Sequence, residues 1–366
     1  MSLTDSSINF LQNSIICVGN FIDVLTRRVV RSPAAHSILV TDGFPHTRIQ
    51  EQGEAMSRLI GYFAAIVMAI FASGAEAATN SCGSGGTITG TDGELARPYQ
   101  ERTFTTTSGA ERKWLLRLPS GYEEGTPADV VFLFHGATST AERVFEYTDF
   151  EPLADRDGVI LVMPDANKVF YDQSHELAGY WNRAWEAKWR ERDYDVDFVL
   201  ELVELIKTDY CAGDFYTAGM SAGGDMTTAL QCLADSPFLS YAPVTYRYYI
   251  EDECKDAPPR PMLSFHGSED KVVPLEGLDA PWFDAHMSVI MQSWAEHNGC
   301  DRQTIEERVS DEVLHYRWSN CEAATEWYLI EGGGHTWPGN EVAPVYGHST
   351  MDISATKLIW QFFFRD

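Results

Sequence analysis

The chain has 366 residues, and its hydrophobic share of 44% is typical of a globular protein with a substantial core. Its 54 acidic residues against 27 basic ones give a formal net charge of -27 at pH 7. Nucleic acids and anionic membrane surfaces would be repelled by so acidic a chain. We therefore expect no nucleic-acid partner and no stable membrane association.

The N-terminal region resembles a signal peptide preceded by extra residues. An apolar run of 14 residues, Leu59–Ala72, follows Met56-Ser57-Arg58 and leads to Ala75-Glu76-Ala77. A basic residue, a short apolar run and an A-x-A pattern are typical of secretory signals, and the run is short for a membrane span. A buried helix or an uncleaved anchor is the alternative.

A signal peptide normally begins a protein, so we interpret residues 1–55 as an unstructured extension that arises from a start codon assigned too early. Residues 56–77 are then the signal peptide and 78–366 the mature domain. Cleavage near Ala77 would leave 289 residues, a size suited to one α/β domain, and would make the protein secreted, either extracellular or periplasmic.

Strands and helices are expected to alternate along the mature chain. An opening hairpin is predicted where the alternating runs 103–107 and 113–118 flank Ser108-Gly109. Further strands are expected over 130–134, 159–163, 215–218, 261–265 and 327–330, with helices over 197–206, 222–233 and 353–364. This alternation predicts an α/β fold with a mostly parallel central sheet flanked by helices, in a single catalytic domain. Sites in such folds form at the carboxyl ends of the strands.

One predicted connection, from Pro164 to Tyr194, is unusually long and rich in aromatic residues. Loops of this length in compact domains are usually functional or disordered, and the aromatic content argues against disorder. Trp181, Trp185 and Trp189 are spaced i, i+4, i+8, which would align them on one helix face. Either a packing stripe or a substrate-facing wall would explain that spacing.

Three short motifs follow the order that the α/β-hydrolase fold uses for its serine, acid and histidine. Gly219-Met220-Ser221-Ala222-Gly223 matches G-x-S-x-G, in which a serine occupies a sharp strand-to-helix turn. His266-Gly267-Ser268-Glu269-Asp270 and Gly332-Gly333-Gly334-His335 come later, each after a predicted strand. We therefore predict an α/β-hydrolase fold with a catalytic triad.

Ser221 is the predicted nucleophile, and a serine hydroxyl needs a neighbouring base to take its proton. His335 is the predicted base, and Asp270 is the acid that would orient its ring, with Glu269 as the main rival. The other histidines are expected to be structural or exposed. Among them, His135 and His266 each precede a glycine at a strand end and are expected to shape the turn.

Two backbone N–H groups are expected to form the oxyanion hole. One belongs to Ala222, the residue after the nucleophile. The other comes from the loop after His135-Gly136, either from Ala137 or from its neighbour Thr138.

Six cysteines remain after cleavage at Ala77, an even number that favours disulfides in an exported chain. None has the C-x-x-C spacing of a zinc site, and we expect no metal. Cys300 and Cys321 flank one strand-like segment and form the firmest predicted pair. The remaining predicted pairs are Cys232–Cys254 and Cys82–Cys211.

These motifs together resemble the secreted polyhydroxybutyrate depolymerase-like esterases, a group that shades into the feruloyl and acetylxylan esterases of carbohydrate esterase family 1. The resemblance extends from about residue 100 to 365, and its most specific part is the segment GGGHTWPG that contains His335. It implies an α/β-hydrolase, a triad of Ser221, Asp270 and His335, no cofactor, and a position for Trp337 beside the bound acyl or aryl group. Trp181 is a second candidate for an aromatic wall that contacts this group.

The chain departs from the group in several places. Ala137-Thr138 stands where many polymer depolymerases have Cys-Thr, the loop around Tyr180-Trp181-Asn182 is long and acidic, and we expect no binding module after the catalytic domain. These departures count against polymer substrates.

The leading hypothesis is a secreted serine esterase that cleaves feruloyl or related esters of polysaccharide. A polyhydroxybutyrate or other polyester depolymerase and an acetylxylan esterase are the alternatives. From another class, a non-catalytic carbohydrate-binding protein could use a hydrolase scaffold, but it would have no need of a strained serine turn.

Overall fold

The structure is a computed structural model that describes residues 98–166, 169–170, 176–177, 181, 195–246, 254–277, 285–341 and 347–365. They belong to a unit that spans Asn80–Asp366. The predicted extension (1–55) and signal peptide (56–77) lie outside the described residues and stay predictions. Within the described part of the chain, no helix combines the length and apolar character that crossing a membrane requires.

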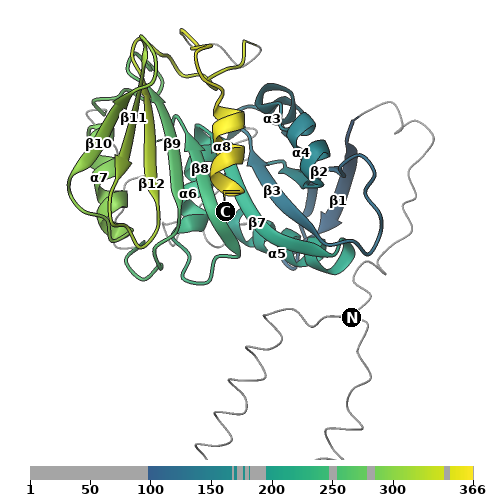
Figure 1. Ribbon diagram of the computed structural model, residues 1–366. Helices are drawn as coiled ribbons and strands as arrows, with labels where there is room; N and C mark the ends of the chain where they lie inside the picture. The colour runs from purple at the N-terminus through teal and green to yellow at the C-terminus, as the bar shows by residue number, and fades with distance from the viewer. Residues whose placement is uncertain are drawn as a thin grey trace, which may run out of the picture. The chain divides into compact units, whose positions relative to one another are not determined.

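Strands and helices alternate along the chain, as the sequence predicts (Figure 1). The strands are β1 (Gln100–Thr105), β2 (Glu111–Arg117), β3 (Ala128–Phe134), β4 (Ile160–Pro164), β5 (Val169–Phe170), β6 (Glu176–Leu177), β7 (Ala212–Met220), β8 (Phe238–Val244), β9 (Met262–Gly267), β10 (Thr304–Arg308), β11 (Val313–Trp318) and β12 (Thr325–Ile330). The helices are α3 (Ala141–Thr148), α4 (Glu151–Asp157), α5 (Asp195–Asp209), α6 (Ala222–Gln231), α7 (Met287–His297) and α8 (Ala355–Phe363).

Ten of the described strands form one sheet, in the order β1-β2-β4-β3-β7-β8-β9-β12-β11-β10. The six central strands β4, β3, β7, β8, β9 and β12 are parallel to one another. The outer pairs β1-β2, β2-β4, β12-β11 and β11-β10 are antiparallel. The opening hairpin and the mostly parallel sheet are therefore confirmed. With the serine turn at the carboxyl end of β7, the predicted α/β-hydrolase fold is confirmed too.

Helices cover both faces of this sheet (Figure 1). Along β3, Val131 and Leu133 join the core beneath α3, α4 and α8, while Val130 and Phe132 join the core beneath α5 and α6. This sorting follows from the two-residue period of a strand. Because both faces are covered, β3 is apolar along almost its whole length, and the sheet fixes the ends of its central strands rigidly.

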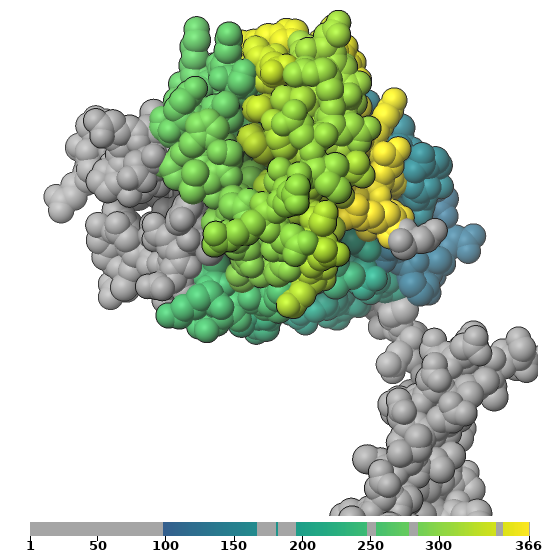
Figure 2. Space-filling model, turned by 60° about the vertical axis from the view of Figure 1, so that its left-hand side comes forward, coloured from purple at the N-terminus to yellow at the C-terminus, as the bar shows by residue number. Residues whose placement is uncertain are grey.

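The edge beyond β12 is a hairpin of β10 and β11, where the sequence predicts one strand between Cys300 and Cys321. Figure 2 looks toward this side, and the yellow-green residues near 300–320 fill its centre. The side chains of β10 are mostly exposed and include Glu306, Glu307 and Arg308. Such a charged edge strand shows little alternation of apolar and polar residues, so it is hard to recognise from the sequence. Its charges disfavour pairing with the strands of other chains.

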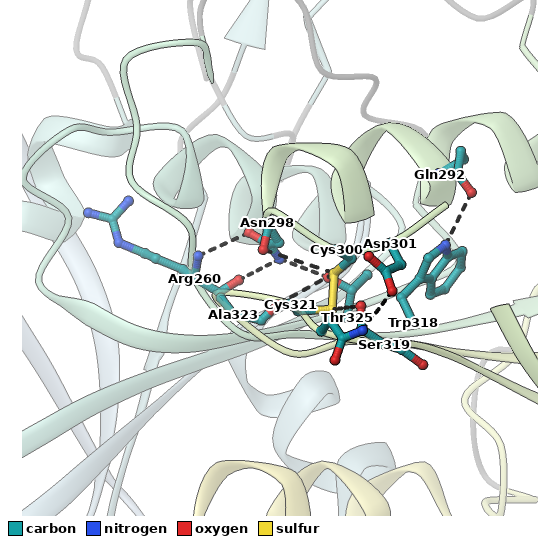
Figure 3. The surroundings of a disulfide bond; sticks show 11 residues. Arg260, Gln292, Asn298, Cys300, Asp301, Trp318, Ser319, Cys321, Ala323 and Thr325 are labelled. Carbon is teal, nitrogen blue, oxygen red and sulfur yellow. Dashed lines mark hydrogen bonds between the residues drawn. A yellow bond between two sulfur atoms is a disulfide. The ribbon is translucent and has the colours of Figure 1, made fainter. Parts of the chain in front are cut away.

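Two of the predicted disulfides, Cys300–Cys321 and Cys232–Cys254, are confirmed. The Cys300–Cys321 bridge lies beside the buried side-chain amide of Asn298 (Figure 3). Its Nδ2 donates to the Arg260 carbonyl and to Thr325 Oγ1, both at 2.9 Å, and its Oδ1 accepts from the Arg260 N–H at 3.0 Å. The amide thus joins the end of α7 to the beginnings of β9 and β12. Cys82 lies outside the described residues, so Cys82–Cys211 stays a prediction.

Candidate active site

Ser221 occupies the turn between β7 and α6, with φ 58° and ψ -123°. A positive φ is strained for a residue with a Cβ, and it holds the serine out of both neighbouring elements. The flanking glycines permit the turn. A Cβ at Gly219 would collide with the Gly223 carbonyl, and one at Gly223 would collide with the Phe134 carbonyl. The first turn of α6 therefore packs directly on the end of β3.

The loop after β3 passes beside this serine. A Cβ on Gly136 would lie 3.5 Å from both the Ser221 Cβ and the Met220 carbonyl oxygen. Ala137 follows, half-buried, and Thr138 has a φ of 60°. Ala222 is the first residue of α6, where an N–H has no acceptor within the helix. The two predicted oxyanion donors, Ala137 and Ala222, thus belong to the two segments that meet at Ser221.

The structure brings Asp270 and His335 together. The distance between His335 Nδ1 and Asp270 Oδ2 is 2.7 Å, and each residue is only 3% exposed. Asp270 Oδ1 accepts the N–H groups of Val272 and Val273, both at 2.8 Å, so its carboxylate is fixed before it meets the ring. The rival acid, Glu269, is exposed. Of the two candidates, Asp270 is the one placed against the histidine.

Backbone hydrogen bonds join the acid loop to the histidine loop, because β9 and β12 are parallel neighbours. The N–H of Glu269 donates to the Gly333 carbonyl, and the N–H of Ser268 donates to the Ile330 carbonyl, both at 2.8 Å. In return, the Gly332 N–H donates to Ser268 Oγ at 2.8 Å. The position of His335 relative to Asp270 is therefore set by the sheet.

A second segment, 347–350, holds the histidine loop from outside. The His348 carbonyl accepts the Gly334 N–H, and the Thr350 carbonyl accepts the Gly339 N–H, both at 2.8 Å. Sequence reasoning missed this strap. Its contacts are made by backbone carbonyls, which every residue type has, so no motif in the sequence indicates them.

The rings of the two histidines that precede a glycine at a strand end, His135 and His266, both contact backbone carbonyls. His135 Nδ1 lies 2.7 Å from the Gly136 carbonyl oxygen, and His266 Nε2 lies 2.8 Å from the Val273 carbonyl oxygen. Burial lowers the pKa of both rings, which favours their neutral forms. Among the described residues, no group of three or more His, Cys, Asp or Glu side chains could hold a metal ion.

The structure corrects the predicted aromatic wall at Trp337. This side chain is fully buried: its Nε1 donates to Thr356 Oγ1 at 3.0 Å, and its ring packs against Tyr147 and Phe150. Trp337 follows the histidine in sequence, but it points into the core beneath α3 and α8.

Trp181 is also buried, at 1% exposure, and it lies at the end of β3. Its Nε1 donates to the His135 carbonyl at 2.8 Å, and its ring contacts those of Phe134 and His135. The structure therefore shows Trp181 as a packing residue at the base of the Gly136 loop. Trp185 and Trp189 lie outside the described residues.

Parts of this chain are similar in sequence to known proteins. Residues 105–245 match the family named Esterase. The chain is 25% identical over 239 residues to feruloyl esterase B of Piromyces equi, covering 61% of this chain and 42% of that protein. It is 23% identical over 256 residues to feruloyl esterase C of Emericella nidulans, covering 69% of this chain and 83% of that protein. The chain therefore spans less than half the length of the first relative and most of the second.

Among solved structures, the chain is similar to an acetyl xylan esterase from Aspergillus awamori, with 14% identity, a TM-score of 0.49, and coverage of 65% of this chain and 93% of that one. It is also similar to LpqC, a poly(3-hydroxybutyrate) depolymerase from Bordetella parapertussis, with 17% identity, a TM-score of 0.43, and coverage of 66% and 87%. The sequence matches confirm the predicted resemblance and support a carboxylic ester hydrolase. The chain is an α/β-hydrolase whose segment 105–245 matches the Esterase family and whose relatives include feruloyl esterases.

Proposed function

We propose that the protein is a serine carboxylic ester hydrolase with Ser221, Asp270 and His335 as its catalytic triad. The observation that carries the proposal is the buried 2.7 Å contact between His335 Nδ1 and Asp270 Oδ2. It lies at the same sheet edge as the strained serine turn. A carboxylate on Nδ1 selects the tautomer whose Nε2 can accept a proton, as a general base must.

In the proposed reaction, Ser221 Oγ attacks the ester carbonyl carbon while His335 Nε2 takes the hydroxyl proton. The tetrahedral oxyanion is bound by the N–H groups of Ala222 and Ala137. Collapse of this intermediate breaks the bond to the alcohol, which leaves with the proton from His335. Water then attacks the acyl-enzyme by the same steps, releasing the acid and restoring Ser221.

Feruloyl or related esters of polysaccharide are the proposed substrates. The names of the two relatives support this class, and the departures from the polymer depolymerases at Ala137-Thr138 count against polyester. Export is part of the proposal. It is supported by the two disulfides, which persist in oxidising compartments, and by the signal-like segment 56–77.

Hydrolysis of p-nitrophenyl acetate tests the reaction. Ser221→Ala should lower kcat by several orders of magnitude, because triad members act as a unit. The matched control is Ser293→Ala, whose hydroxyl bonds the Ile290 carbonyl on α7, and it should keep wild-type kcat. A folded wild-type protein without Ser221-dependent hydrolysis would favour the carbohydrate-binding alternative.

The substrate class is tested separately, by comparing kcat/KM on methyl ferulate, acetylated xylan and polyhydroxybutyrate. Methyl ferulate should give the highest value. Higher activity on either polymer would replace the feruloyl assignment with the corresponding alternative and leave the triad unaffected.

A further inference from the structure

We propose that His135 is a positioning residue whose ring turns the Gly136–Ala137 peptide so that the Ala137 N–H faces the oxyanion formed at Ser221. The inference rests on the proposed function, and it assigns to a fully buried histidine outside the triad a role in that reaction. Three features of the molecule support this role: the tautomer of the ring, the orientation of the peptide, and the anchoring of the ring itself.

The tautomer of His135 follows from its two partners. Ring Nε2 lies 3.1 Å from the N–H of Ala166, which can only donate, so Nε2 is an acceptor without a hydrogen. Ring Nδ1 lies 2.7 Å from the Gly136 carbonyl oxygen, which can only accept, so Nδ1 carries the hydrogen. Burial lowers the pKa of His135, and the Gly136 carbonyl and the Asp165 carboxylate oppose only part of that shift. The ring is therefore a neutral donor to Gly136.

The orientation of the next N–H follows from peptide geometry. In a planar trans peptide, the carbonyl of one residue and the N–H of the next point in opposite directions. Drawing the Gly136 carbonyl toward the buried ring therefore turns the Ala137 N–H away from it. Gly136 lies beside the nucleophile, because a Cβ added to it would be 3.5 Å from the Ser221 Cβ. The Ala137 N–H belongs to the peptide that follows Gly136, so its direction decides whether it can reach an oxyanion formed at Ser221. The Ser139 N–H also donates to this carbonyl, at 3.2 Å.

The ring can impose this orientation because it is held on several sides. Its bond from Ala166 ties it to the end of β4, and the His135 carbonyl accepts the indole N–H of Trp181 at 2.8 Å. The Trp181 ring packs on the imidazole with centroids 4.9 Å apart. Thr138, with its positive φ, needs a loop fixed in this way, since its strained backbone persists only where the surroundings hold it.

Two substitutions test the roles of the two ring nitrogens of His135 separately. In His135→Asn, the side-chain amide sits where Nδ1 was and can still donate to Gly136, but it is too short to reach Ala166. In His135→Gln, the amide oxygen can still accept from Ala166, but no donor remains for Gly136. Each variant loses one hydrogen bond, so both should lose stability, whereas only His135→Gln should release the peptide.

We expect His135→Gln to lower kcat on p-nitrophenyl acetate by roughly tenfold to a hundredfold with little change in KM, since loss of a whole oxyanion donor costs about 10²–10³. His135→Asn should stay within a few-fold of wild type. Affinity for a trifluoromethyl ketone, which binds as an oxyanion adduct on Ser221, should fall in His135→Gln by the same factor as kcat/KM. The control His315→Gln, whose ring pairs with Glu326 on β12, should keep wild-type kcat and ketone affinity.

Equal kcat in the two His135 variants, or losses that follow their melting temperatures, would overturn the inference and leave a purely structural histidine. Wild-type kcat and ketone affinity in His135→Gln would overturn it as well. Absence of Ser221-dependent hydrolysis in the wild type would instead overturn the proposed function, and this inference with it.

Discussion

His335 Nδ1 and Asp270 Oδ2 lie 2.7 Å apart although the two residues are separated by 65 positions in the chain. The contact is buried, and the other carboxylate oxygen is already committed to the N–H groups of Val272 and Val273. A carboxylate held this way can turn only slightly. It therefore fixes both the tautomer and the direction of the imidazole.

Asp270→Asn should lower kcat by roughly 10⁴-fold, because an amide that donates to Nδ1 would stabilise the wrong tautomer. Glu269→Gln is the matched control, since it changes the adjacent carboxylate, which is exposed, and should alter kcat by less than a few-fold. Steady-state kinetics on p-nitrophenyl acetate measure both. A mild Asp270→Asn together with a damaging Glu269→Gln would show that the acid is misassigned.

Trp337→Phe should destabilise the fold without changing selectivity. The phenyl ring would keep part of the packing on Tyr147 and Phe150 but would leave Thr356 without its indole donor, at a cost of about 1–2 kcal/mol. Urea denaturation measures the loss. Values of kcat/KM for methyl ferulate and p-nitrophenyl acetate should change by the same factor. A loss confined to methyl ferulate, with stability unchanged, would return Trp337 to the substrate wall.

The double substitution Cys300→Ala/Cys321→Ala should lower the free energy of unfolding by about 3 kcal/mol, since the bridge closes a loop with a sequence separation of 21. Native-state kcat should stay near wild type, because the bridge lies at the outer hairpin (Figure 3). Cys232→Ala/Cys254→Ala opens a loop of similar size, with a separation of 22, but at the end of α6. That variant should lose similar stability and also lose activity. Lost activity in the Cys300→Ala/Cys321→Ala variant, with wild-type activity in the Cys232→Ala/Cys254→Ala variant, would contradict this prediction.

The Lys113–Glu142 pair should make stability depend on pH in the acid range. Lys113 Nζ lies 2.5 Å from Glu142 Oε1. Partial burial raises the pKa of Glu142, but hydrogen bonds from Lys113 and Thr140 outweigh it and lower the pKa from 4.5 to about 2. A depressed pKa contributes stability that is complete above about pH 4.5 and is lost as pH falls toward 2.

Glu142→Gln should therefore be less stable than wild type at pH 6, by roughly 0.5–1 kcal/mol after allowance for solvent screening. The difference should shrink as pH falls from 5 to 3. Urea denaturation across this range measures it, with Glu146→Gln, on the same helix but paired with Arg143, as the control for removing a carboxylate. A difference that is constant with pH would show that the Lys113 pair is not its source.

Motifs with a local physical cause could be predicted from the sequence. The turn at Ser221 needs small neighbours on both sides, so G-x-S-x-G marks it directly. Strand β3 is apolar on both faces because helices cover both, which a continuous run such as Val130–Phe134 indicates without any knowledge of the tertiary structure. The fold class followed from the alternation of such runs with helical segments.

Long-range packing decided the rest. Glu269 and Asp270 are adjacent and chemically alike, and only the pairing of β9 with β12 determines which one meets His335. Trp337 follows the histidine motif but is drawn into the core by Thr356 and Tyr147, which come from distant helices. The charged segment β10 forms a strand because its backbone pairs with the free edge of β11. A sequence fixes what each residue can do within a few neighbours, whereas the direction of a side chain depends on elements brought beside it by the fold.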